Sequence, residues 1–191
     1  MASKTAFIIG DSISQGYRRQ AEESLGSVGI ATEWFSGGSS AQLLAGLPEW
    51  IPGTQPDLIQ FNCGLHDARY FDIARTYQQP IGNYELLLSG IVRWLQANTD
   101  ADLVWATTTP VIADRITLEY RRSAEAVLAY NAVAKNIMND AGVPIVDLHG
   151  VIESAGATQN ISPDGVHMTD GGYAVLAHAV SGGIIDRLAD R

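Results

Sequence analysis

The chain has 191 residues, 46% of them hydrophobic and 17% charged, a length and composition typical of one globular domain spanning residues 1–191. The net charge of −9 argues against nucleic acid or an anionic membrane surface as a partner, because both are bound through clustered lysines and arginines. The single cysteine, Cys63, excludes an intrachain disulfide. No secretory signal or membrane span is recognisable, so we expect a cytoplasmic protein, with a secreted mature form as the alternative.

Short apolar runs alternate with segments of helical periodicity. The predicted strands are residues 6–9, 29–35, 57–63, 102–107 and 143–147, and the predicted helices are 17–25, 84–96, 124–138 and 173–188. This alternation indicates an α/β fold, in which right-handed crossovers cover a parallel sheet on both faces. The least regular stretch, residues 67–80, is expected to be a loop that shapes the substrate pocket.

A tight turn near the N-terminus offers a candidate nucleophile. Gly10, Asp11 and Ser12 follow the first predicted strand and precede a helical stretch. In parallel α/β sheets ligands bind at the carboxyl ends of the strands. The amino end of a helix also supplies free N–H groups and a positive dipole, which suit a developing negative charge. We therefore expect Ser12 to attack the substrate.

A second turn near the C-terminus can activate that serine. Asp164 and His167 are three positions apart, so both side chains can reach one partner. A serine hydroxyl needs a base to accept its proton, and the base needs a group to orient it. His167 as base and Asp164 as orienting group meet that need. The available donors to an oxyanion are the backbone N–H groups of Ser12 and Gly38 and an imidazole N–H of His66.

Taken in order, these motifs resemble the SGNH (GDSL-type) hydrolases. The matching blocks are Gly-Asp-Ser near the N-terminus, glycine after the second strand, Gly-x-x-Asp after the third and Asp-x-x-His near the C-terminus. The resemblance implies a three-layer α/β/α sandwich with a flavodoxin-like parallel sheet. It implies that Ser12 is both nucleophile and oxyanion donor, that Gly38 is the second donor, and that Asp164 and His167 complete a catalytic triad.

Two positions depart from the pattern of that family. Ser36 stands where asparagine usually precedes the glycine of the second block, and His66 replaces the asparagine of the third block, which donates to the oxyanion. A neutral imidazole can present one N–H to the same point, but only in the correct tautomer. We expect His66 to take the asparagine's role, with a helix cap or an ordinary hydrogen-bonded histidine as alternatives.

Other polar residues near these blocks have simpler interpretations. We expect Asp11 to cap or brace the nucleophile turn, and Asp67 to tie the third-block loop to its neighbours. His149 is interpreted as an ordinary histidine at a strand end, and Cys63 as a packing residue on a buried strand. Residues 107–110 end the fourth strand and either face the site or only terminate the strand.

The sequence therefore predicts a serine esterase for small O-acyl esters, such as acetyl groups on carbohydrates. An acyltransferase on the same triad, or a lipase or thioesterase for longer acyl chains, is the alternative. A third class is a metal-dependent phosphoesterase or a binding module, whose candidate ligands would be Asp11, His66, Asp67, His149, Asp164 and His167. No close metal-binding spacing such as His-x-x-x-His occurs, so we expect no metal and no other cofactor.

Overall fold

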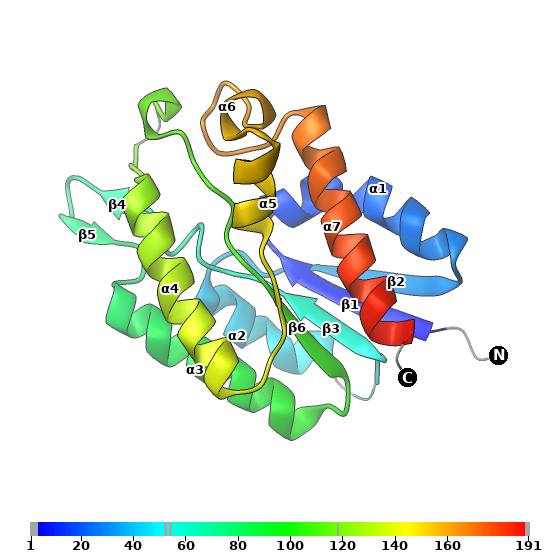
Figure 1. Ribbon diagram of the computed structural model, residues 1–191. Coiled ribbons are helices and arrows are strands. Elements are labelled where there is room, and N and C mark those ends of the chain that lie inside the picture. The colour runs from blue at the N-terminus through cyan, green and yellow to red at the C-terminus, as the bar shows by residue number, and fades with distance from the viewer. Residues whose placement is uncertain (1–3, 52, 54, 118, 190–191) are drawn as a thin grey trace.

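The computed structural model describes residues 4–189 except 52, 54 and 118 (Figure 1). Five parallel strands form one sheet in the order β2-β1-β3-β6-β7. Their bounds are β1 Lys4–Gly10, β2 Ile30–Ser36, β3 Leu58–Phe61, β6 Asp102–Ala106 and β7 Ile145–Val146. This order is the flavodoxin-like arrangement, and the predicted α/β class is confirmed.

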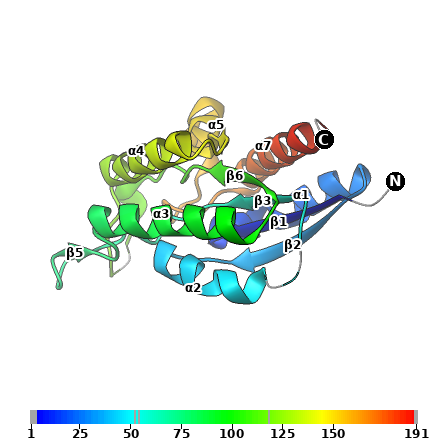
Figure 2. The ribbon, with the colours of Figure 1, turned by 90° about the horizontal axis from the view of Figure 1, so that it is seen from below.

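Helices cover both faces of the sheet, so the molecule has three layers (Figures 1 and 2). One face packs against α1 (Ser12–Ser27), α5 (Leu148–Ala155) and α7 (Asp170–Ala189), and the other against α2 (Ser40–Trp50), α3 (Ile81–Asn98) and α4 (Ala124–Asp140). Strand β1 shows why: Ala6 and Ile8 enter the first core, whereas Phe7 and Ile9 enter the second. All four side chains are buried, as expected for a central strand of a parallel sheet.

Several predicted bounds need correction. The fifth strand is only Ile145–Val146, because Val143 still bonds to the end of α4 through Met138 and Asp147 already caps α5. The third strand ends at Phe61, and the helix predicted at 17–25 begins earlier, at Ser12. Helices α2 and α5 and the short α6 (Ala157–Asn160) were not predicted.

The loop predicted over residues 67–80 contains a small hairpin. Strand β4 (Tyr70–Phe71) pairs antiparallel with β5 (Thr76–Tyr77), and the two tyrosine rings meet edge to face with centroids 5.1 Å apart. Tyr70 also forms a backbone bridge with Arg121, in the segment that follows the 3₁₀ turn η1 (Ala113–Arg115). The hairpin therefore joins the region after β3 to the region after β6. None of the described helices is long and apolar enough to cross a membrane.

Candidate active site

The sheet order places the candidate site between the ends of β1, β2 and β3. From β1 the chain crosses to β2 on one side and then to β3 on the other, so the crossovers diverge at the carboxyl end of β1. Gly10 pairs with Ser36 of β2, and Ile9 pairs with Phe61 of β3. The loops that follow these three strands therefore start side by side, at the position where open α/β sheets bind ligands.

The nucleophile turn is held by its own side chains. Asp11 is the N-cap of α1, and its Oδ1 accepts a hydrogen bond from the Ile13 N–H at 2.9 Å. Asp11 is buried, and this burial raises the pKa of its carboxyl group, against the opposing effect of that hydrogen bond. Ser12, the first helical residue, is exposed. The expected bracing role of Asp11 is thus observed, with the serine hydroxyl presented to solvent.

The structure brings Ser12, His167 and Asp164 together from opposite ends of the chain. Ser12 Oγ lies 2.9 Å from His167 Nε2, although the two residues are 155 positions apart. His167 Nδ1 lies 2.7 Å from Asp164 Oδ2. An ionised carboxylate at this distance accepts a hydrogen bond from Nδ1, and in a neutral ring with hydrogen on Nδ1 the other nitrogen, Nε2, is an acceptor for the serine hydroxyl.

Asp164 is kept ionised by its turn. Partial burial would raise the pKa of this carboxyl group, but hydrogen bonds from Ser162 Oγ, the Val166 N–H and His167 hold it far below its usual value. The Asp164 Oδ1 distances are 2.7 Å to Ser162 Oγ, 2.8 Å to the Val166 nitrogen and 2.9 Å to the His167 nitrogen. Gly165 has φ +78°, a left-handed conformation that lets the chain reverse between the two residues.

The glycine loop after β2 lies against the nucleophile turn. The Gly37 N–H donates to the Gly10 carbonyl at 2.6 Å. Gly38 has φ +60°, and a Cβ at that position would lie 2.6 Å from Gln42 Oε1. The Gln42 side chain is needed there, because it completes a capping box with Ser39 at the start of α2. The left-handed backbone therefore favours glycine at position 38, and a side chain there would displace the capping glutamine.

His66, on the loop after β3, is half-buried among cations. Burial, Arg69, Arg122 and His167 together lower its pKa to about 4, so the imidazole is neutral at neutral pH. Its Nε2 lies 3.3 Å from Arg69 Nη2. The ring is thus neither a helix cap nor paired with the adjacent carboxylate of Asp67, which instead bonds to Ser40.

Two arginines lie beside His66. Arg69 belongs to the loop that the sequence predicted to shape the substrate pocket, whereas Arg122 was not predicted to be near the site. The guanidinium carbons of Arg69 and Arg122 lie 4.7 and 4.8 Å from the ring centroid of Tyr120. Arg122 is buried, and its Nε donates to the Leu65 carbonyl at 2.6 Å. Burial lowers the pKa of Arg122 to about 10, which still leaves it charged at neutral pH. No short sequence motif predicts this cluster, because its members come from two distant segments. The bridge between Tyr70 and Arg121 brings Tyr120 and Arg122 next to the loop of His66 and Arg69.

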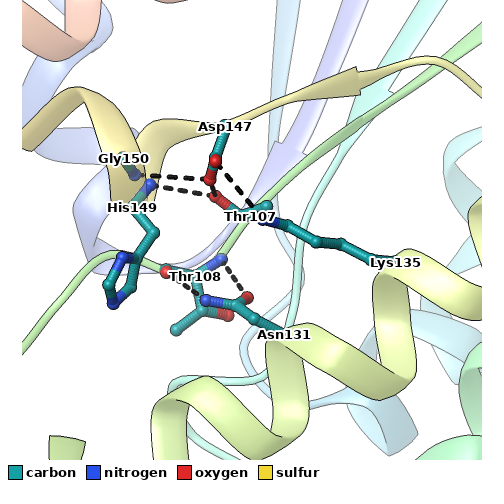
Figure 3. Close-up of polar contacts among 7 residues, drawn as sticks. All are labelled: Thr107, Thr108, Asn131, Lys135, Asp147, His149 and Gly150. Atoms are coloured by element: carbon teal, nitrogen blue, oxygen red, sulfur yellow. Dashed lines mark hydrogen bonds and ion pairs between the residues drawn. The ribbon is translucent and has the colours of Figure 1, made fainter.

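The threonines after β6 support neighbouring helices (Figure 3). Thr107 Oγ1 donates to Asp147 Oδ1 at 3.0 Å and accepts from the His149 backbone N–H at 2.9 Å. Asp147 also accepts a hydrogen bond from the Gly150 N–H at 3.3 Å and meets Lys135 Nζ at 3.2 Å. Partial burial would raise the pKa of its carboxyl group, but the bonds from Gly150, Thr107 and Lys135 lower it. Among the described residues, the hydrogen bonds to the Asp147 carboxylate come from Thr107, Gly150 and Lys135, and none comes from the ring of His149 (Figure 3).

The next threonine fixes α4 to the sheet. The Thr108 N–H donates to Asn131 Oδ1 at 2.9 Å, and Asn131 Nδ2 donates back to the Thr108 carbonyl at 2.8 Å (Figure 3). Thr108 Oγ1 also donates to the carbonyl of Cys63 at 3.3 Å. Cys63 is fully buried, and burial raises the pKa of its thiol well above the ordinary value. This buried environment agrees with the interpretation of Cys63 as a packing residue.

Among the described residues, no three histidine, cysteine, aspartate or glutamate side chains gather closely enough to hold a metal ion. The candidate metal ligands of the sequence analysis have other partners. His167 bonds to Ser12 and Asp164, and Asp67 bonds to Ser40.

The sequence matches the GDSL-like lipase/acylhydrolase family over residues 8–175. The chain belongs to this family. The protein is accordingly a carboxylic ester hydrolase, and its three-layer sandwich is the SGNH fold. The match includes all the blocks that suggested the family, from Gly10 to His167. A comparison with curated protein sequences gives no match.

Solved structures share the fold at low sequence identity. A lipase/acylhydrolase from Enterococcus faecalis is 16% identical, with a TM-score of 0.79 over 96% of each chain. An acetyl xylan esterase, AlAXEase, is 16% identical with a TM-score of 0.75, covering 94% of this chain and 99% of its own. A catalytic mutant of an acetylxylan esterase from Geobacillus stearothermophilus is 18% identical with a TM-score of 0.76, covering 94% and 93%.

Proposed function

We propose that the protein is a serine esterase in which Ser12, His167 and Asp164 form the catalytic triad. The observation that carries this proposal is the continuous hydrogen-bond chain, 2.9 Å from Ser12 Oγ to His167 Nε2 and 2.7 Å from His167 Nδ1 to Asp164 Oδ2. Both distances lie within reach of proton transfer, and the base is oriented by an ionised group.

In this mechanism Ser12 Oγ attacks the ester carbonyl carbon while its proton passes to His167 Nε2. Asp164 stabilises the resulting imidazolium. The tetrahedral intermediate collapses, and His167 returns the proton to the departing alcohol. Water then attacks the acyl-serine and gives a proton to His167 Nε2. As the acyl–oxygen bond to Ser12 breaks, His167 returns that proton to Ser12 Oγ, which releases the carboxylic acid and restores the free serine.

The oxyanion would be held by the backbone N–H groups of Ser12 and Gly38 and by an imidazole N–H of His66. The Ser12 N–H lies at the start of a long helix, where the helix dipole favours negative charge. The hydrogen bond from the Gly37 N–H to the Gly10 carbonyl holds the two loops together. This contact supports placing the Gly38 N–H, the next along the chain, beside Ser12. A neutral His66 donates through one nitrogen, which suits the asparagine-like role.

For the substrate we propose small O-acyl esters, such as acetyl groups on carbohydrates. Support comes from the structural neighbours, which include two acetylxylan esterases. A panel of p-nitrophenyl esters of increasing chain length, tested alongside acetylated xylo-oligosaccharides, measures this preference. Highest kcat/KM on long acyl chains would favour a lipase or thioesterase. A higher yield of acylated alcohol than of free acid, when alcohol acceptors are added, would favour an acyltransferase.

The experiment that tests the mechanism is Ser12→Ala. The variant should fold like the wild type by circular dichroism and lose ester hydrolysis, because it removes the hydroxyl that lies 2.9 Å from His167 Nε2. A sulfonyl fluoride should label Ser12 in the wild type, as read by peptide mass spectrometry. Wild-type turnover in folded Ser12→Ala, or labelling at another serine, would reject the mechanism.

A further inference from the structure

The contact between His66 and Arg69 defines which imidazole nitrogen carries the proton. Arg69 Nη2 lies 3.3 Å from His66 Nε2. A guanidinium has donors only and no acceptor, so Nε2 must be the acceptor in this hydrogen bond. An accepting nitrogen carries no hydrogen. The neutral ring therefore has its single N–H on Nδ1, which has no hydrogen-bond partner among the described residues.

Arg69 is itself held by several contacts. Its N–H donates to the His66 carbonyl at 3.2 Å, which closes a turn and places the two side chains together. Its carbonyl accepts from the Gln78 N–H at 2.7 Å, on the far side of the β4–β5 hairpin. Its guanidinium lies over the Tyr120 ring, with Cζ 4.7 Å from the centroid. The backbone hydrogen bonds and the contact with the Tyr120 ring therefore hold the Arg69 guanidinium, which donates to Nε2 of His66, in place.

The charges around His66 also favour a neutral ring. Arg69 and Arg122 both lie beside Tyr120, and Arg122 is buried. An imidazolium at His66 would be a third positive charge in this cluster and would lose the hydrogen bond to Arg69, since both of its nitrogens would be donors. The imidazole is therefore restricted to one charge state and one tautomer.

We propose that Arg69 is a positioning residue, which fixes His66 in the tautomer with hydrogen on Nδ1 and so presents that N–H to the oxyanion. The tautomer follows from the contact alone, and the oxyanion clause rests on the proposed function. An asparagine amide needs no such partner, because its N–H groups are permanent donors. A histidine at the same position can place its hydrogen on either nitrogen, so it requires a neighbour that selects one.

The tautomer can be read directly by ¹⁵N NMR of histidine-labelled protein at pH 7. The chain has only 4 histidines, and His66→Asn identifies the His66 signals by their loss. In the wild type, Nε2 of His66 should be unprotonated and Nδ1 protonated. In Arg69→Met the ring should populate the opposite tautomer. The matched control is Arg121→Met, since Arg121 pairs with Asp72 and not with His66; it should leave the spectrum of His66 unchanged.

Kinetics test whether Arg69 acts through His66. Arg69→Met should lower kcat about tenfold with little change in KM, less than loss of the whole imidazole donor, which costs about 100- to 1000-fold. Arg69→Lys should recover part of the loss, because an ammonium can also donate to Nε2. In the His66→Asn background, Arg69→Met should have little further effect on kcat, because the group on which it acts is gone.

Hydrogen on Nε2 of His66 in the wild type would overturn the proposal, as would equal losses from Arg69→Met in both backgrounds. The NMR measurement needs no turnover, so it decides the tautomer even if Ser12→Ala retains activity and the esterase mechanism is rejected. Should Arg69→Met fail to fold, the wild-type spectrum and the Arg69→Lys variant still provide the test.

Discussion

The carboxylate of Asp67 accepts hydrogen bonds from the backbone N–H of Ser40, at 3.0 and 3.1 Å to its two oxygens, and from Ser40 Oγ. Both residues are buried. The contact joins the loop after β3 to the first turn of α2, beside Gly38 on one side and His66 on the other. The two loops proposed to hold the oxyanion therefore share one support.

We expect Asp67→Ala to lower the free energy of unfolding by about 2–3 kcal/mol, because it leaves the buried N–H and hydroxyl of Ser40 without an acceptor. It should also lower kcat by about tenfold or more, since the two loops would no longer be held together. Urea denaturation and steady-state kinetics measure both effects. Ser40→Ala removes only the hydroxyl and should cost about 1 kcal/mol. Unchanged stability in Asp67→Ala would show that the contact contributes nothing.

The triad residues should behave as a unit. His167→Ala should lower kcat by at least about a thousandfold, and Asp164→Ala somewhat less, because the base survives but loses its orientation. The double variant should be no worse than His167→Ala alone. His149→Ala is the matched control, since only the backbone of His149 bonds to Thr107, and it should keep wild-type kcat. If His149→Ala lowered kcat strongly while His167→Ala lowered it only mildly, His149 would be the base.

His66 should affect the transition state more than the bound substrate. His66→Ala should lower kcat by about 100- to 1000-fold with little change in KM, because the interaction strengthens only as the carbonyl oxygen becomes an anion. His66→Asn should restore part of the loss. A general base would not be replaced by asparagine, and a metal ligand would make activity sensitive to EDTA. Kinetics of the three proteins with and without EDTA therefore distinguish these roles; full activity in His66→Ala would remove it from the oxyanion site.

The lowered pKa of His66 also predicts a pH dependence of stability. Its pKa is about 4 in the folded protein, against 6.5 for an ordinary histidine. Between these values the unfolded chain binds a proton that the folded protein does not, so stability falls as pH decreases. Wild type should lose stability relative to His66→Asn as pH falls from about 6.5 to about 4, and the difference should be constant above pH 7. Urea denaturation of both proteins across this pH range measures the difference in their free energies of unfolding. A difference that stayed constant throughout would show that folding does not lower the pKa of His66.

Local patterns in the sequence predicted much of the fold. Apolar runs of strand length and helical periodicity depend only on neighbouring residues, so they identified the five strands, the helices α3, α4 and α7, and the later part of α1. Helix α2 escaped notice because it contains Gly46 and Pro48, which usually interrupt helices. Helix α5 was missed because it starts at Leu148, directly after a strand of only two residues.

The residue types of the candidate site were also predictable by sequence alone. Ser12, Gly38, Asp164 and His167 each occur in a short motif whose chemistry follows from its members. Their separations in space do not follow from those motifs. Only the packed sheet and helices bring Ser12 Oγ to 2.9 Å from His167 Nε2 across 155 positions of sequence.

The environment of His66 was decided by the tertiary structure. The sequence established a histidine in place of an asparagine, and hence a donor that depends on its tautomer. A local turn brings Arg69 to Nε2 of His66. Tyr120 and Arg122 lie beside Arg69 because Tyr70 of the β4–β5 hairpin pairs with Arg121, in the segment after η1. Charge and hydrogen bonding act through space over a few ångströms, so a proton's position on an imidazole depends on neighbours that sequence spacing does not specify.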